Sequence, residues 1–570
     1  SELERPRTVT SGNRDHDGPL AFLDRERILL FVLGLVLFLP GLGRHDLWNP
    51  DEPRCAEIAR EMMESSDFLV PRLNGEAYTQ EPPLHFWAIG SMSALLGGLE
   101  ETAVRLPSAL AAIATSLLVY AIGLRLFSQR VAWLAALVFM SSYKVLWQGR
   151  AGQAGMLLTL WTTLAIYAWI RGTLEDRPGL FLAFFAALGL ATLTRGWEGL
   201  APTLLAIVVF LSISGRFREV RRLTLSPGVL IWLAMTLAWL LPAAAAIESV
   251  RFADLLVTEP LVPLFSIDWS ASDQWVSKPW HYYLGTVPVD FLPWSFLFPA
   301  AAWIAWNRAR GEARSWMLFL WAWIVVTLCL FSLSPLKRSV NVLTIFPALA
   351  LMVGFGLDRA QEAWPRFKAA TAVPALLVSV LIAAAGVAVP LLQTRPELTD
   401  LDPGLARSIA MILVLGAIGI SLGSRWFWTG NVRAAVDVTT VGMGILILGA
   451  SLIVAPRLDS FKSARPLASQ VLAHLDIDQR LVMFPRLEPG VLFYTRHLAD
   501  LAGSEGQLLS FLEEDPDLLL VARRRSLADL EEPLPLVEIY RDHALRDGWS
   551  LLGPAGTEPD EPPSEREPDG

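Results

Sequence analysis

Two adjacent carboxylates, Asp51 and Glu52, stand where the chain leaves an apolar run, in the stretch DLWNPDEPRCAEIAREM at residues 46–62. A carboxylate within hydrogen-bond reach of a hydroxyl can take its proton, so both are candidate catalytic residues. Pro53 suits the first turn of a helix, and the residues after it keep helical i,i+3 and i,i+4 spacing. The pair has two interpretations. It caps this helix, or it is kept at a membrane boundary for function, because an uncompensated charge there is costly.

The elements that must position this pair are mostly apolar. The chain has 570 residues, of which 53% are hydrophobic and 18% charged, with 22 tryptophans and a mean hydropathy of +0.43. Soluble domains carry about a quarter charged residues, so this composition is typical of a polytopic membrane protein. The net charge of −9 offers no basic footprint for nucleic acid. The two cysteines, Cys55 and Cys329, favour neither a disulfide framework nor a thiolate metal site.

Apolar runs of roughly 17–25 residues predict membrane spans. We expect about thirteen, near residues 27–42, 105–126, 131–147, 154–170, 179–194, 199–214, 228–247, 286–306, 315–334, 339–356, 370–392, 404–422 and 434–455. The run PLHFWAIGSMSALLGG at 83–98 is short and glycine-rich, which predicts an interfacial helix instead.

Lysine and arginine divide the loops into two alternating sets, and the richer set is predicted to be cytoplasmic. That set contains Arg125, Arg130, Arg171, Arg177, Arg216, Arg218, Arg221, Arg222, Arg308, Arg310, Arg314, Arg359, Arg366, Lys368, Arg425 and Arg433. The outer loops at 43–104 and 248–285 then face the periplasm. We therefore expect a multi-pass protein of the cytoplasmic (inner) membrane, with its site on the periplasmic side.

The predicted organisation has four parts. Residues 1–22 are polar and predicted to be a disordered cytoplasmic tail, and 23–456 form the transmembrane domain. Residues 457–553 alternate β-prone runs with helical stretches, which predicts a small periplasmic α/β domain. Residues 554–570 are rich in Pro and Glu and are predicted to be disordered. The expected fold class is an all-α polytopic membrane domain with a small C-terminal α/β domain.

The first outer loop resembles a known family. The helix sequence DEPRCAEIAREM, followed by PRLNG, Tyr78 and PPL, is similar to the corresponding loop of GT-C glycosyltransferases. The likeness is strongest to the bacterial aminoarabinose transferases and their protein-mannosyltransferase relatives. It continues through LTRGWEG (193–199), KPWHYYLGTVPVDFLPW (278–294) and SPLKRSVNVLTIFPALALMVG (334–354) and covers nearly the whole chain.

The resemblance implies an enzyme of GT-C fold that takes a sugar from a polyprenyl (undecaprenyl) phosphate carrier. The acceptor would be a hydroxyl or phosphate on a lipid A-type glycolipid, a glycan or a protein. Asp51 inherits the role of catalytic base, and one carboxylate without a covalent intermediate suggests inversion, by analogy with glycoside chemistry.

The leaving lipid phosphate needs cations or backbone donors. The candidate substrate- and phosphate-binding residues are Arg54, Tyr78, Gln80, Glu81, Arg195, Lys278, Lys337 and Arg338. The alternative for each cation is a side chain that snorkels to the membrane interface.

Several positions depart from the family pattern. Where the family usually reads Y.EKPPL, this chain has Gln80 in place of the acid and Glu81 in place of the lysine. Glu81 is thus one residue away from the lost carboxylate and is expected to replace it. A second family acid is replaced by Gly155, and Arg195 stands where the family usually has lysine. These changes keep a catalytically inactive relative open as an alternative.

Two further groups are candidates for binding. No cofactor is certain from the sequence, but a divalent metal is one option, with Asp51, Glu81 and His281 as weak candidate ligands. Aromatic side chains in the outer loops either form an interfacial belt or pack against a sugar ring or prenyl tail. These are Trp48, Trp280, Tyr282 and Tyr283.

Two classes of function remain: a glycosyltransferase, and a transporter or flippase for a lipid-linked sugar. The charged candidate site residues lie in the outer loops and the predicted spans are nearly free of charge, which favours the enzyme. The expected partners are the lipid-linked donor, the acceptor and membrane lipids, without nucleic acid.

Overall fold

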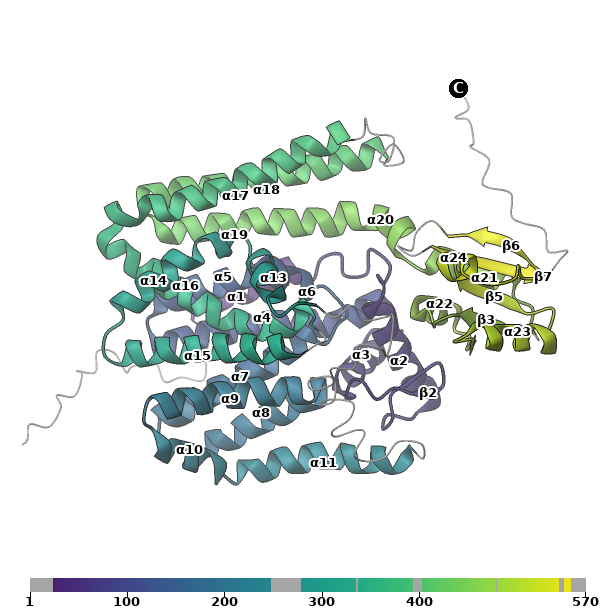
Figure 1. The fold of residues 1–570 in the computed structure, drawn as a ribbon. Helices are drawn as coiled ribbons and strands as arrows, with labels where there is room; N and C mark the ends of the chain where they lie inside the picture. Colours follow the sequence, from purple (N-terminus) through teal and green to yellow (C-terminus); the bar gives the residue numbers. More distant parts are fainter. Residues whose placement is uncertain are drawn as a thin grey trace, which may run out of the picture.

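The structure is a computed structural model that describes residues 24–247, 278–334, 337–392, 402–477, 479–542 and 548–554. Helices that run side by side form a large bundle, and a smaller α/β unit lies at one end of it (Figure 1). The bundle consists of α1 (Arg25–Phe38), α4 (Glu101–Leu126), α5 (Gln129–Met140), α6 (Tyr143–Gln148), α7 (Gly155–Leu174), α8 (Gly179–Arg195), α9 (Trp197–Ile213), α10 (Phe217–Thr224), α11 (Gly228–Ala246), α13 (Tyr282–Asp290), η2 (Trp294–Phe296), α14 (Phe298–Arg308), α15 (Glu312–Leu333), η3 (Ser339–Ile345), α16 (Phe346–Ala360), η4 (Gln361–Ala363), α17 (Trp364–Leu392), α18 (Pro403–Thr429), α19 (Val432–Gly449), η6 (Ala450–Val454) and α20 (Ala455–Lys462).

The core of the bundle is built around α16, which is buried along its length. Two glycines allow this burial by letting neighbouring helix backbones approach closely. A Cβ atom at Gly356 would lie 2.2 Å from the carbonyl oxygen of Ala301 in α14, and one at Gly354 would lie 2.9 Å from the amide nitrogen of Ala135 in α5. A larger residue at either position would push α16 away from its neighbours.

Seven helical segments in the described part of the chain are long and apolar enough to cross a membrane. They are Glu101–Leu126, Gly228–Ala246, Glu312–Leu333, Ser339–Ala360, Trp364–Leu391, Pro403–Thr429 and Val432–Lys462. The protein is therefore a multi-pass membrane protein, but the predicted count of thirteen spans is not confirmed. Among the other predicted spans, α8 and α9 have 17 residues each, which is the lower limit for a crossing, and α1 has 14, which is below it.

Two predicted spans are interrupted by residues that lie outside any helix. The segment 131–147 is divided into α5 and α6 at Ser141 and Ser142, whose hydroxyls bond to carbonyls four residues back. The segment 286–306 is divided into α13, η2 and α14, because Pro293 has no amide hydrogen for a continuous helix. Apolar composition does not reveal such breaks, which is why the spans were predicted as continuous.

The segment between α1 and α4, which the sequence predicts as the first outer loop, forms a separate subdomain at one end of the bundle. It contains α2 (Asp51–Ser65), a two-stranded antiparallel ribbon of β1 (Arg72–Leu73) and β2 (Glu76–Ala77), and α3 (Leu84–Leu96). The predicted helix at 83–98 is thus present as α3. Figure 1 shows α2, α3 and β2 on the same side of the bundle as the α/β unit.

The C-terminal residues form a small α/β unit, which confirms this part of the predicted fold class. Its five strands lie in the order β4-β3-β5-β7-β6, with β4, β3 and β5 parallel and β7 antiparallel to both β5 and β6. The elements are α21 (Arg465–His474), β3 (Leu481–Phe484), α22 (Pro489–Thr495), β4 (Asp500–Leu501), α23 (Glu505–Glu514), β5 (Leu519–Arg523), α24 (Arg524–Ala528), β6 (Leu536–Arg541) and β7 (Trp549–Pro554).

The predicted domain boundary after residue 456 falls inside a helical run, because α19, η6 and α20 follow one another without a break through Lys462. The predicted tail at 1–22, most of the outer loop 248–285 and nearly all of the tail 554–570 lie outside the described residues.

The α/β unit is docked onto the first outer loop by specific hydrogen bonds. The side chain of Asn74 donates to the carbonyl of Ala499 at 2.7 Å and accepts from the Ala499 amide at 2.9 Å. The amide of Leu47 donates to the hydroxyl of Tyr494 at 2.9 Å. The loop that carries the acidic pair is therefore held on one side by the bundle and on the other by the α/β unit.

Candidate functional site: an arginine–carboxylate cluster at one end of the bundle

The acidic pair occupies the first turn of α2, but neither carboxylate bonds to the amides that a capping residue would satisfy. Pro50 is the N-cap residue, and no side chain caps the helix. Successive residues of a helix point about 100° apart. Asp51 and Glu52 therefore face different neighbours, and the structure gives them different environments.

Glu52 is buried and held by α4 and the loop before α2. Its two oxygens accept from the Nε and Nη2 atoms of Arg105, each at 2.8 Å, from the amide of Gly152 at 2.7 Å and from the amide of Trp48 at 3.0 Å. Burial alone would raise the pKa of Glu52, but the Arg105 guanidinium and these hydrogen bonds hold it below its usual range. A carboxylate bound this way is stabilised in its charged form.

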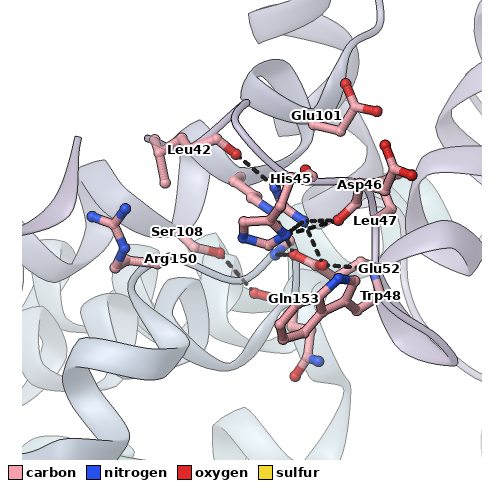
Figure 2. A network of polar contacts seen from close by, with 12 residues as sticks. Leu42, His45, Asp46, Leu47, Trp48, Glu52, Glu101, Ser108, Arg150 and Gln153 are labelled. Atoms are coloured by element: carbon pink, nitrogen blue, oxygen red, sulfur yellow. Dashed lines mark hydrogen bonds and ion pairs between the residues drawn. The ribbon is translucent and has the colours of Figure 1, made fainter. Parts of the chain in front are cut away.

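Arg105 is fully buried and connects Glu52 to the segment of the chain that precedes α2. It donates to the carbonyls of Leu42, His45 and Asp46 at 2.6–2.8 Å. Figure 2 shows Glu52 enclosed by His45, Asp46 and Trp48 within this network. We call Glu52 and Arg105 the clamp. The clamp fixes the position where α2 begins, so Glu52 is a positioning residue in this structure. Each of its oxygens already accepts two hydrogen bonds, which leaves neither oxygen free for the predicted role as a base.

Asp51 faces away from the clamp, towards two other arginines. Its Oδ1 accepts from Arg54 at 2.7 Å, one turn further along α2, and its Oδ2 accepts from Arg338, which lies just before η3. The Asp51 side chain is 13% exposed. Arg338 is in turn fixed through its backbone carbonyl, which accepts from the Tyr283 hydroxyl at 3.2 Å.

A second carboxylate continues the cluster. Glu81 accepts from Arg195 at 2.6 Å and lies 4.0 Å from Arg54. Arg195 also donates to Glu198 at 2.9 Å and to Asn341 at 3.4 Å. Burial would lower the pKa of Arg54, but Tyr78, Asp51 and Glu81 raise it above its usual value, so the guanidinium stays charged.

We call Asp51, Arg54, Glu81, Arg195, Glu198 and Arg338 the arginine–carboxylate cluster. Its members come from four separate segments of the chain: α2, the loop before α3, the α8–α9 junction and the segment before η3. The cluster has three carboxylates and three guanidinium groups, so its formal charge is balanced. An entering anionic group would therefore compete with the carboxylates for the same arginines.

The remaining predicted residues divide into those beside the cluster and those apart from it. The Tyr78 hydroxyl donates to Gln80 at 3.3 Å, and its ring lies 6.0 Å from the Arg54 guanidinium. Lys337 is buried and donates to the Ser334 carbonyl at 2.6 Å, so it is turned into the backbone of its own segment.

The aromatic candidates also differ from one another. Tyr283 is buried, whereas Trp280 is 71% exposed. Lys278 lies over the ring of Tyr282 at 4.4 Å instead of in the cluster. Trp48 bonds through its indole nitrogen to Asp459 at 2.9 Å, which makes it part of the contact between the first loop and α20.

The predicted metal ligands do not form a site in the described residues. No group of three His, Cys, Asp or Glu side chains converges in that part of the chain. Asp51 and Glu81 each bond to arginine, and His281 is exposed next to Trp280. Metal binding therefore stays a prediction, without a preformed ligand set among these residues.

The packing around residue 155 explains why this position is a glycine. A Cβ atom there would lie 2.3 Å from Val340 of η3 and 3.3 Å from the side-chain oxygen of Gln148. Val340 thus fills the space that an acidic side chain would need. The same short helix carries Asn341 and follows Arg338, so this packing helps to fix the part of the cluster that η3 supplies.

Sequence reasoning missed Arg105 and Asn341. Arg105 had a usable signal, because it is a charged residue at the start of the predicted span 105–126, and charged residues within spans are usually paired. Asn341 had none, because nothing in the run SVNVLTI separates it from an ordinary helical residue.

The sequence is similar to those of known sugar transferases. Residues 80–241 match the family described as dolichyl-phosphate-mannose-protein mannosyltransferase. A transferase of Proteus mirabilis named undecaprenyl phosphate-alpha-4-amino-4-deoxy-L-arabinose arabinosyl transferase 2 is 27% identical over 72% of this chain and 74% of that protein. A transferase of Aeromonas hydrophila with the corresponding name is 32% identical over 58% of this chain and 59% of that protein.

Solved structures show the same fold. ArnT from Cupriavidus metallidurans bound to undecaprenyl phosphate superposes with a TM-score of 0.74 and 22% identity over 95% of this chain and 99% of that chain. The archaeal oligosaccharyltransferase AglB from Archaeoglobus fulgidus superposes with a TM-score of 0.53 and 11% identity over 87% of this chain and 69% of that chain. The chain therefore shares the fold of these solved structures over most of its length, and residues 80–241 are similar to the mannosyltransferase family.

Proposed function

We propose that this protein transfers a sugar from an undecaprenyl-phosphate-type carrier to an acceptor at the periplasmic face of the cytoplasmic membrane. The observation that carries the proposal is the cluster itself. Three arginines and the carboxylate of Asp51 meet at one end of a helical bundle whose fold is shared with a protein solved with undecaprenyl phosphate.

The arginines supply the groups that a lipid phosphate needs. Guanidinium groups bind phosphate through paired, charge-assisted hydrogen bonds. In the structure, Arg54 and Arg338 bond to Asp51, and Arg195 bonds to Glu81. We propose that the donor phosphate takes over bonds from Arg54 and Arg338. This exchange would stabilise the leaving phosphate and release the Asp51 carboxylate.

Asp51 would then act on the acceptor. Both oxygens of Asp51 accept hydrogen bonds from arginines in the structure, so the carboxylate can take the proton of an attacking hydroxyl only when such a bond is released. Donor binding and activation of the acceptor would thus be coupled through the same two arginines. An acceptor phosphate would need no base, and Asp51 would then serve only to orient the arginines.

The two alternatives receive less support from the structure. A flippase needs charged groups along a path through the bilayer, but the cluster lies at one end of the bundle. An inactive relative was suggested by Gln80, Glu81 and Gly155. Glu81 bonds to Arg195 and lies near Arg54, as expected of a carboxylate that replaces the lost one, and Gly155 is accommodated by Val340.

The test uses the full-length protein in proteoliposomes with undecaprenyl phosphate-α-4-amino-4-deoxy-L-arabinose, the donor that the relatives' names give. Wild-type protein is expected to release undecaprenyl phosphate in the presence of a lipid A acceptor. Asp51→Asn is expected to lower the rate by about 10²- to 10⁴-fold. The matched control is Asp176→Asn, a change at an exposed aspartate on another loop.

Undiminished turnover in Asp51→Asn would remove the proposed role of Asp51. No turnover by wild-type protein with this donor, together with movement of intact donor across the bilayer, would favour the flippase. Turnover with a different polyprenyl-phosphate sugar would keep the reaction and change only the sugar.

A further inference from the structure

A cavity of about 560 Å³ lies far from the arginine–carboxylate cluster. It is lined by the start of α8, by α10 and by the turn into α11, while Arg195 of the cluster stands at the other end of α8. Seventeen helical residues separate the two ends of α8, or about 25 Å. Figure 1 shows α10 at the end of the bundle opposite the α/β unit.

The walls of the cavity have two different characters. Arg218, Arg221 and Arg222 of α10 supply cationic groups on one side. Leu182 and Leu225 supply apolar surface, and both are more than a third exposed. A wall of this kind combines charge with exposed hydrocarbon.

The arginines are not committed to strong internal partners. Within the described part of the chain, Arg218 and Arg221 have no ion pair. Arg222 bonds to Asp176 at 2.7 Å and stacks 5.3 Å from the ring of Phe181. The Asp176 side chain is 82% exposed, and an ion pair so open to water contributes little stability. An anionic ligand can therefore recruit all three guanidinium groups.

The local charge balance stays positive when the nearby acids are included. Glu219 lies 3.9 Å from Arg216, and Glu175 bonds to Arg171 at 2.8 Å. Glu175 is therefore paired outside the cavity and Asp176 with a lining arginine, while Glu219 of α10 lies only at the limit of an ion pair with Arg216. Arg216, Arg218, Arg221 and Arg222 still outnumber Glu219 and Asp176.

The position of α10 favours a lipid over a soluble anion. Phe217 at its start and Leu225 just after its end are 66% and 69% exposed. A short helix that presents basic and apolar residues together is typical of a helix lying at a membrane surface. The loop is also among the most arginine-rich on the predicted cytoplasmic side, where anionic lipids attract basic residues.

We propose that this cavity binds the headgroup of an anionic phospholipid of the cytoplasmic leaflet. The phosphate would bond to Arg218, Arg221 and Arg222, and the glycerol and upper acyl chains would lie against Leu182 and Leu225. The site is separate from the proposed transfer reaction and does not depend on it.

The experiment measures lipid binding to full-length detergent-purified protein by native mass spectrometry. The probes are phosphatidylglycerol, phosphatidylethanolamine and inorganic phosphate. Wild-type protein is expected to retain phosphatidylglycerol in preference to phosphatidylethanolamine. The double variant Arg218→Gln/Arg221→Gln is expected to bind phosphatidylglycerol about 30-fold more weakly, since each arginine near an anionic lipid contributes about fivefold.

The matched control removes two arginines from another predicted cytoplasmic loop, as Arg308→Gln/Arg310→Gln, and is expected to keep the wild-type affinity. Both pairs are exposed, so neither change removes buried packing. Equal loss in the two double variants, or no preference for phosphatidylglycerol in wild-type protein, overturns the proposal. Displacement of phosphatidylglycerol by millimolar inorganic phosphate also overturns it, because a soluble phosphate would then be the ligand.

Discussion

Two neighbouring carboxylates on one helix have opposite surroundings. Glu52 is enclosed by a buried arginine and two backbone amides, whereas Asp51, one residue earlier, bonds to two arginines that are 16% and 27% exposed. The clamp joins α2 to α4 through buried side chains, whereas the cluster joins four segments through side chains that are partly exposed. The comparison indicates that the clamp determines where α2 lies, and that the cluster is left free to exchange partners with an anion.

The largest effect expected from this comparison concerns stability. Glu52→Gln removes one charge of a buried ion pair and leaves Arg105 unpaired, which is expected to cost about 3–5 kcal/mol of unfolding free energy. Asp51→Asn is expected to change stability by less than about 1 kcal/mol, because its partners are partly exposed. The measurement is the unfolding midpoint of both variants in the same detergent, followed by tryptophan fluorescence.

Equal destabilisation by the two changes would contradict this expectation, because the clamp and the cluster would then contribute equally to the stability of the fold. A Glu52→Asp variant is the useful control. It keeps the charge but shortens the side chain, so it is expected to lie between wild-type protein and Glu52→Gln.

The sequence predicted the fold and named several residues that the structure brings together in the cluster, but it did not predict the different contacts of the two carboxylates. Apolar runs located helices along the whole bundle, and the resemblance identified Asp51 and its arginines. The breaks at Ser141 and Pro293 could not be predicted, because short polar or proline interruptions are common within spans. Arg105 lies 53 residues from Glu52 in sequence, so only tertiary packing shows that they meet.

The departure at Glu81 gives the next prediction. Glu81 would compete with a donor phosphate for Arg195 and also lies near Arg54, so Glu81→Gln is expected to lower the KM for the donor by about fivefold. The physical reason is that one anion is removed from a charge-balanced cluster. The measurement is a donor titration of initial rates in proteoliposomes, with Glu64→Gln on the exposed side of α2 as the control.

An increase in KM for Glu81→Gln would contradict this expectation. It would mean that Glu81 holds the arginines in position for the phosphate more than it competes with it.

A smaller effect is expected from pH at the clamp. Burial first, and then Arg105, lower the pKa of His45 from 6.5 to about 4. Between these values the unfolded chain binds more protons than the folded one, so stability falls as pH drops from 6.5. The expected loss at pH 5 is about 1 kcal/mol, allowing for partial exposure of the ring. Unfolding midpoints at pH 7.5 and 5 should differ less in His45→Gln than in wild-type protein.

Glu52 does not interfere with that measurement, since its pKa is lowered from 4.5. Its contribution is complete above pH 4.5 and is lost only as the pH falls further. If the pH dependence of stability is unchanged in His45→Gln, then His45, which lies next to Arg105 of the clamp, is not the group whose titration lowers stability.

The α/β unit is expected to respond to pH with the opposite sign, which separates it from the clamp. Glu488, buried at the start of α22, has its pKa raised by burial from 4.5 to about 7, although it accepts from the Gly490 amide. The folded state binds more protons here, so this contribution is present at low pH and is lost as pH rises through 7. Glu488→Gln is therefore expected to be more stable than wild-type protein at pH 8, by about 1 kcal/mol, and no more stable at pH 5. Unfolding midpoints at the two pH values measure this directly. A gain of equal size at both would mean that packing around α22, and not titration of Glu488, is responsible.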